Sequence, residues 1–114
     1  MALEYVVLRY YVTRSMLHRM SDPTLLVLAS LADGDKHGYA IMTDVREFAG
    51  VDLGPGTLYG AITRLEQRGF IKALAADDRR RPYRLTAAGR EHLQRQLAAL
   101  EPIVRVGARR LRHV

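Results

Sequence analysis

The chain has 114 residues, which suits one domain that has its own hydrophobic core and still gains from a partner subunit. Its formal net charge of +6 favours an anionic partner, either nucleic acid or a membrane surface. It contains no cysteine, which excludes disulfides, thiolate nucleophiles, thiol redox sensing and cysteine metal sites.

Residues 1–20 are predicted to form an N-terminal dimerisation arm. The apolar stretch from Tyr5 to Val12 is too short to span a bilayer, Arg9 interrupts it, and no signal-peptide cleavage pattern follows. We therefore expect a cytoplasmic protein without a membrane partner. A heptad-like spacing favours a helix, whereas β-prone residues between 6 and 12 leave an added strand or a disordered leader as alternatives. The spaced residues are Leu3, Val6, Tyr10, Thr13, Leu17 and Met20.

Two short helices are predicted next, at the start of a domain that spans residues 21–86. Asp22 and Pro23 begin the first helix and Gly34 ends it, while the second runs from His37 to Gly50. We expect His37 to make a local hydrogen bond at the helix start rather than to bind a metal. These two helices would support a third.

The third helix is predicted over residues 55–68. Gly54 or Gly56 can serve as its N-cap, and Gly69 ends it. Apolar residues recur at positions i, i+4 and i+7, which predicts a buried stripe along one face of this helix. The opposite face carries groups that hydrogen-bond phosphate oxygens and base edges, so it is a candidate DNA-binding surface; an ordinary solvated helix exterior is the alternative. The buried stripe is Leu58, Ile62 and Leu65, and the candidate DNA-binding residues are Thr57, Tyr59, Gly60, Thr63, Arg64, Gln67 and Arg68.

A basic β-hairpin is predicted to follow, with strands at 70–75 and 82–86. Pro82 suits an edge strand, and the turn at 76–81 begins with two aspartates. The turn is either a solvated charged loop or a polyanion-binding wing, and adjacent like charges that repel one another favour the wing. Its candidate DNA-binding residues are Arg79, Arg80, Arg81 and Arg84.

Residues 87–114 are predicted to form a C-terminal dimerisation helix. Thr86 can cap it, and Pro102 should kink the helix rather than end it. A second heptad-like stripe runs along the helix, and a short core cannot bury both stripes. The two stripes are therefore expected to meet across the two-fold axis of a homodimer. This stripe is Leu93, Leu97, Leu100, Val104, Gly107 and Leu111.

The order and spacing of several short motifs resemble the PadR family of winged helix-turn-helix transcriptional regulators over roughly residues 22–100. The resemblance implies a mainly α fold with a small β-hairpin, α+β overall. It also implies that 56–68 is the recognition helix and 77–84 the wing. The chain departs from the commoner pattern by lacking tryptophan and by having Gly60 where proline often follows the tyrosine. The motifs are His37-Gly38-Tyr39, Gly56-Thr57-Leu58-Tyr59, Arg64-Leu65-Glu66, Gly69-Phe70-Ile71 and Tyr83-Arg84-Leu85-Thr86 with Gly89.

The preferred functional hypothesis is a dimeric, sequence-specific repressor that binds a pseudo-palindromic operator in double-stranded DNA. A polar helix face next to a charged wing favours specific readout over a non-specific architectural DNA-binding protein. A winged-helix protein-interaction module that never binds DNA is the other alternative. No enzyme, cofactor or metal site is predicted, because the four histidines are scattered without metal-ligand spacing.

The resemblance further suggests that a planar aromatic or drug-like effector relieves repression at the dimer interface. Residues from both ends of the chain could line such a pocket, but heptad positions are normally filled, which favours the alternative that they fill the dimer core. They are Tyr5, Arg9, Tyr10, Gln96, Leu97 and Leu100.

Overall fold

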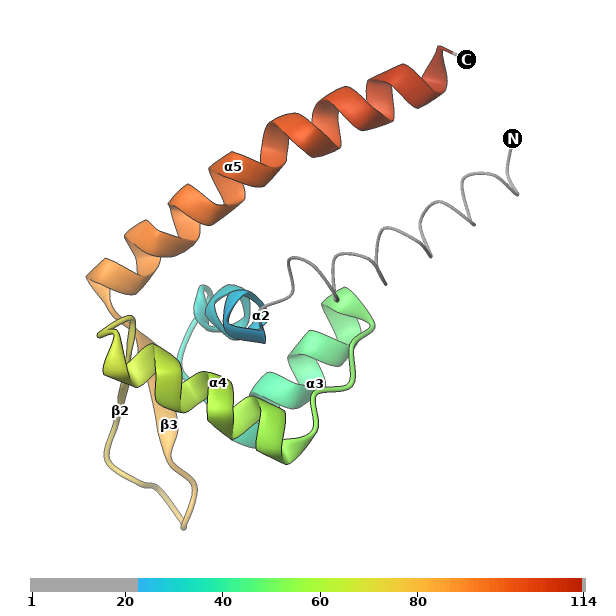
Figure 1. Ribbon diagram of the computed structural model, residues 1–114. Coiled ribbons are helices and arrows are strands. Elements are labelled where there is room, and N and C mark those ends of the chain that lie inside the picture. Colours follow the sequence, from blue (N-terminus) through green and yellow to red (C-terminus); the bar gives the residue numbers. More distant parts are fainter. Residues whose placement is uncertain (1–22, 114) are drawn as a thin grey trace.

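The computed structural model describes residues 23–113, which form four helices and a small sheet (Figure 1). The predicted N-terminal arm lies outside these residues. In the described part no helix is long and apolar enough to cross a membrane. The elements in chain order are α2 (Pro23–Leu31), β1 (Lys36–His37), α3 (Gly38–Ala49), α4 (Pro55–Gln67), β2 (Ile71–Ala73), β3 (Pro82–Leu85) and α5 (Ala87–Arg112).

Helices α2 and α3 form the base on which α4 rests. The His37 ring accepts a hydrogen bond from the Ala40 amide at 3.4 Å, which confirms the predicted helix start. Gly50 ends α3 in the left-handed region at φ 67°. The buried Ser30 hydroxyl donates to the Asp44 carboxylate at 2.7 Å, so α2 and α3 are joined by a polar contact as well as by apolar packing.

Helix α4 has the predicted limits. Gly54 is the N-cap, Pro55 occupies the first turn, and Gly69 follows the helix at φ 76°. The amide of Phe70 donates back to the Leu65 carbonyl at 3.0 Å and closes the helix end. The stripe predicted to be buried lies in the core, together with Val27, Leu28, Leu31, Ile41, Val45, Ala61 and Ile71.

The sheet has the strand order β1-β3-β2, with both pairings antiparallel. The prediction that Pro82 lies on an edge strand is therefore wrong, because β1 covers the other side of β3 and places His37 opposite Pro82. Pro82 is accommodated as the first residue of β3. Its carbonyl still accepts from the Leu74 amide at 2.8 Å. β1 has only two residues, too few to show an alternating pattern in the sequence.

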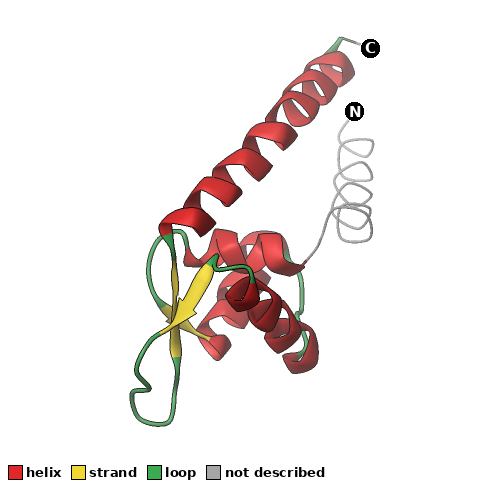
Figure 2. Ribbon diagram, turned by 60° about the vertical axis from the view of Figure 1, so that its left-hand side comes forward, coloured by secondary structure: helices red, strands yellow, loops and turns green. Residues whose placement is uncertain are grey.

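Helix α5 starts against the body and then leaves it. The Thr86 hydroxyl accepts from the Gly89 amide at 3.0 Å, which confirms the predicted cap, and the helix continues through Pro102. Leu93 is buried in the core of its own chain, so the predicted stripe begins inside the fold. Figure 2 shows the hairpin loop projecting from one end of the molecule and α5 rising from the other.

The start of α5 touches the end of the α4–β2 connection so closely that Gly89 has no room for a side chain. A Cβ at Gly89 would lie 2.0 Å from the Phe70 carbonyl oxygen. We predict that Gly89→Ala lowers the free energy of unfolding by about 1–3 kcal/mol, the usual effect of overpacking. Urea denaturation measures this change.

The matched control is Gly56→Ala in α4, where nothing lies within 4 Å of an added Cβ. We expect this variant to equal or exceed the wild type, because alanine is favoured over glycine in a helix by about 1 kcal/mol. Equal urea midpoints for the two variants would contradict the close contact.

Candidate nucleic-acid interface

The outer face of α4 carries the side chains that were predicted to bind DNA. Thr57, Tyr59, Thr63 and Arg64 are exposed, and the apolar stripe on the opposite side is buried. Because that stripe is fixed in the core, the polar face has one orientation relative to the wing. The first two-thirds of α4 therefore present hydroxyl, phenol and guanidinium groups on one surface.

Tyr59 lies across the start of α3. Its hydroxyl oxygen would be 2.6 Å from a Cβ built on Gly38, so the glycine makes room for the ring. The side chain is nevertheless 50% exposed. The Thr63 hydroxyl donates to the Tyr59 carbonyl at 2.9 Å, which fixes its rotamer and leaves its lone pairs available as acceptors.

Gly60 sits in the interior of α4 on this same face. An added Cβ would meet only the Arg64 guanidinium, at 3.6 Å, which is ordinary van der Waals contact. Glycine inside a helix is less favourable than alanine by about 1 kcal/mol. Packing within the described residues thus does not require glycine at position 60. The helix is less stable with this glycine than it would be with alanine.

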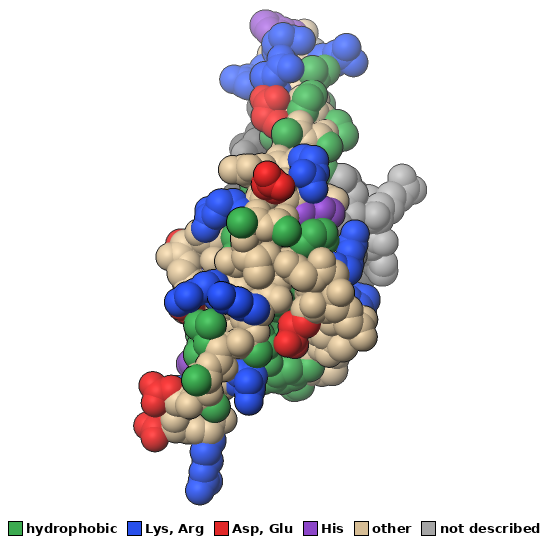
Figure 3. All heavy atoms as spheres, turned by 90° about the vertical axis from the view of Figure 1, so that its left-hand side faces the viewer, with side chains coloured by type: hydrophobic (Ala, Val, Ile, Leu, Met, Phe, Trp, Pro, Cys, Tyr) green, Lys and Arg blue, Asp and Glu red, His purple; other side chains and the backbone are tan. Residues whose placement is uncertain are grey.

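The wing ends in a tight two-residue turn. The amides and carbonyls of Asp77 and Arg80 exchange two hydrogen bonds of 2.8 Å, with Asp78 and Arg79 between them at φ 47° and 68°. This left-handed region ordinarily takes glycine or asparagine, and an arginine there is strained by roughly 1–2 kcal/mol. Basic and acidic side chains at the tip extend in different directions (Figure 3).

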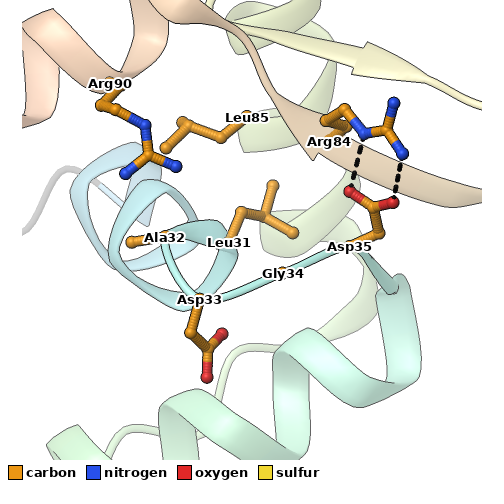
Figure 4. Close-up of a pocket in the computed structure, with 8 residues that line it drawn as sticks. All are labelled: Leu31, Ala32, Asp33, Gly34, Asp35, Arg84, Leu85 and Arg90. Carbon is orange, nitrogen blue, oxygen red and sulfur yellow. Dashed lines mark hydrogen bonds and ion pairs between the residues drawn. The ribbon is translucent and has the colours of Figure 1, made fainter.

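The remaining wing arginines differ in how they are held. Arg81 donates to the Leu74 carbonyl at 3.4 Å and stays exposed. Arg84 instead forms a two-bonded ion pair with Asp35, through Nε at 3.0 Å and Nη2 at 2.8 Å (Figure 4). The Arg84 guanidinium, which was predicted to bind DNA, therefore already has a carboxylate partner within the protein.

Asp35 also balances charge across the sheet. Lys72 on β2 and Arg84 on β3 are directly opposite each other, a like-charge pair that would be destabilising without a counterion. The Arg84 guanidinium, and to a smaller extent Lys72, hold the pKa of the Asp35 carboxyl below its usual range. Asp35 precedes Arg84 by 49 residues, so sequence spacing could not pair them.

Arg68 caps the end of α4 that is next to α5, away from the wing tip (Figure 1). Its guanidinium carbon is 4.9 Å from the centre of the Phe70 ring. Phe70 in turn stacks on His92 of α5, with ring centres 4.3 Å apart and planes 13° from parallel. Helical periodicity alone places Arg68 on the predicted DNA-binding face. The structure places it in a contact between two helices. Gln67 lies in the same last turn of α4.

The residues predicted to line an effector pocket are only partly described. Gln96 and Leu97 are exposed on α5, and Leu100 is partly covered. Tyr5, Arg9 and Tyr10 lie outside the described residues. None of the three described residues lines the hollow in Figure 4, which lies between the end of α2 and the start of α5 and includes Leu31, Leu85 and Arg90. Within residues 23–113, no group of three potential ligand side chains could hold a metal ion.

Comparisons with known proteins agree with this geometry. Residues 27–95 match the family model described as the transcriptional regulator PadR-like family. The chain is 39% identical over 84 residues to a transcriptional regulator of Mycobacterium tuberculosis, covering 71% of this chain and 78% of that protein. It is also 49% identical over 78 residues to an uncharacterized 37.1 kDa protein in a transposon of Streptomyces fradiae. That match covers 68% of this chain but spans only 23% of the Streptomyces protein.

A solved structure shows the same architecture. The crystal structure of Bacillus subtilis PadR in complex with operator DNA aligns with a TM-score of 0.60 and 24% identity, over 65% of this chain and 45% of that one. This likeness concerns the fold. It confirms the predicted winged helix, mainly α with a small β wing.

Proposed function

Because this chain belongs to the PadR-like family of transcriptional regulators, we propose that it is a cytoplasmic homodimer that binds a pseudo-palindromic operator in double-stranded DNA and represses transcription. The family consists of regulators rather than enzymes. The operator DNA named for the Bacillus subtilis protein supports the same class of ligand here. The rest of the proposal concerns which residues make the contacts.

The proposed contact surface consists of the first two-thirds of α4 and the tip of the wing. A helix of this size enters the major groove, where hydroxyl, phenol and guanidinium groups reach base edges. The wing arginines then neutralise flanking phosphates. We leave out Arg68, which lies over the Phe70 ring, and Arg84, which is paired with Asp35. Gln67 is left out because it is the last residue of α4, next to Arg68. The proposed contacts are Thr57, Tyr59, Gly60, Thr63, Arg64, Arg79, Arg80 and Arg81.

One observation carries the proposal: two positions on this surface hold residues that are locally unfavourable. Gly60 weakens the helix although a methyl group would fit, and Arg79 occupies a left-handed turn position that suits glycine. Local rules of stability are broken mostly at functional sites. A close approach of the DNA backbone explains the missing side chain at Gly60, and a phosphate or groove contact explains the long cation at Arg79.

This pattern favours specific DNA binding over the two alternatives. An architectural protein needs positive charge to bind phosphates, but it does not need a helix face whose polar groups can hydrogen-bond to base edges. A protein-interaction module would need an acidic partner to relieve the repulsion among Arg79, Arg80 and Arg81, whereas DNA supplies phosphates along its whole length.

The proposed dimer rests on the far part of α5. Leu97, Val104 and Leu111 are 50%, 62% and 54% exposed and follow one another along a single helix face. The helix projects from the body, so the described residues of its own chain leave this stripe uncovered. Pairing with a second copy would bury it and would place two recognition helices on two half-sites.

A small aromatic effector remains a prediction from the family resemblance. To act as an inducer it would have to bind the DNA-incompetent arrangement of the dimer better than the competent one. The partly covered Leu100, beside Gln96 and Leu97, gives such a ligand an apolar wall on α5.

Gly60→Ala separates DNA contact from folding. We predict a more stable protein, by about 0.5–1 kcal/mol, because alanine favours the helix. Affinity for a duplex selected by the wild type from a random library should fall about tenfold or more, equivalent to about 1.4 kcal/mol, because the methyl group meets the DNA. Thermal melting and fluorescence anisotropy measure the two quantities.

Gly56→Ala is the matched control, since it lies in the same helix with nothing within 4 Å of an added Cβ. Because Gly56 is not among the proposed contacts, Gly56→Ala should bind the selected duplex like the wild type. The proposal fails at this residue if Gly60→Ala binds the selected duplex as tightly as the wild type.

Leu97→Asp tests the dimer. A carboxylate in an apolar interface is desolvated without a partner, which costs several kcal/mol. We expect sedimentation to show a folded monomer that has lost binding to the paired site. Ala99→Asp, on the opposite face of the helix, should remain dimeric. A wild type that sediments as a monomer at tens of micromolar, or a Leu97→Asp dimer, would rule out this interface.

A further inference from the structure

The residues that follow α4 are joined to the start of α5 by hydrogen bonds to the backbone and by stacked side chains. On the backbone side, the Thr86 amide donates to the Phe70 carbonyl at 3.0 Å, and the Thr86 hydroxyl donates to the Gly69 carbonyl at 2.7 Å. Gly89 then lets the first turn of α5 approach the same carbonyl closely. The end of the recognition helix and the start of α5 are thereby fixed to each other at one point.

A fixed point still permits tilting, which the packing of Leu93 in the core and a stack of side chains both oppose. Arg68 covers one face of Phe70, and His92 stacks on that ring from the second turn of α5. The His92 ring nitrogen also lies 3.4 Å from the Gln96 amide nitrogen. Burial, and the nearby charges of Arg68 and Arg95, lower the pKa of His92 and so disfavour a third positive charge beside these two arginines.

The stack lies at the base of the long part of α5 that projects from the body, so a small change of angle there moves the far end of the helix by a large distance. Beyond Leu93, α5 is mostly exposed with respect to the rest of residues 23–113, and it extends roughly 28 Å to Arg112 at 1.5 Å per residue. A tilt of about 10° at the joint therefore moves its far end by about 5 Å. That exceeds the rise of about 3.4 Å per base pair along the DNA axis. In a dimer held by α5, such a tilt would displace one recognition helix relative to the other by more than a base pair.

We propose that His92 is a positioning residue which, through Phe70 and Arg68, fixes the angle between α4 and α5 and so sets the half-site spacing that the dimer accepts. This inference rests on the proposed function, since it requires a dimer that binds paired half-sites. It assigns Arg68 to the joint instead of to the DNA. It also explains why an aromatic residue follows the helix-ending glycine at position 70.

The test compares operators that differ only in spacing. Wild-type protein first selects a palindromic duplex from a random library. Dissociation constants are then measured at fixed salt for that duplex, for versions with the half-sites moved by one and two base pairs, and for an isolated half-site. We expect the wild type to lose about tenfold in affinity for a one-base-pair shift, a difference of about 1.4 kcal/mol.

His92→Ala should bind the isolated half-site like the wild type but lose less than about threefold for the same shift, equivalent to under about 0.7 kcal/mol. His92→Phe, which keeps a stacking ring, should restore the wild-type preference. Gln94→Ala, an exposed neighbour on α5, serves as the control and should behave like the wild type. Circular dichroism checks that each variant is folded, and Phe70→Leu replaces His92→Ala if that variant is unfolded.

The inference is overturned if the folded stack variant keeps the wild-type spacing preference, or if His92→Phe loses it as fully as His92→Ala. These outcomes differ from failure of the proposed function. In that case the wild type would enrich no sequence from the library, before any variant is compared.

Discussion

The burial of one face of α4 is the constraint on which the rest of the structure depends. Leu58, Ile62 and Leu65 are each at most 1% exposed, so they fix the rotation of the helix about its own axis. A rotation that exposed them would lose about 1.5–3 kcal/mol for each side chain. The orientation of the polar face and its position beside the wing follow from this packing.

Local signals in the sequence were sufficient for the helices and their ends. The stripe on α4, the capping groups at His37 and Thr86, and the glycine after α4 all act over three to seven residues, a range that periodicity and capping rules cover. The confirmed winged helix follows from these signals and from the order of motifs. The assignment of individual DNA contacts stays a prediction, supported by exposure and by the unfavourable residues at Gly60 and Arg79.

Contacts between distant residues could not be predicted in the same way. β1 forms because Lys36 and His37 lie beside the otherwise unpaired edge of β3 and pair with it. Arg84 pairs with Asp35, and Arg68 joins a stack with His92, although both arginines fit the helical or strand pattern of a DNA-binding surface. An arginine side chain can bind a DNA phosphate or form an ion pair or ring contact within its own protein, and its neighbours in the folded structure decide between the two.

The salt dependence of DNA affinity tests the central claim, that the contact surface is the wing tip and the first two-thirds of α4. Each phosphate contact contributes about 0.9 to the slope of log affinity against log salt, so in a dimer Arg80→Ala should reduce that slope by about 2. Arg68→Ala should leave the slope unchanged, because its guanidinium lies on Phe70. An unchanged slope for Arg80→Ala, or an equal reduction for Arg68→Ala, would contradict the account.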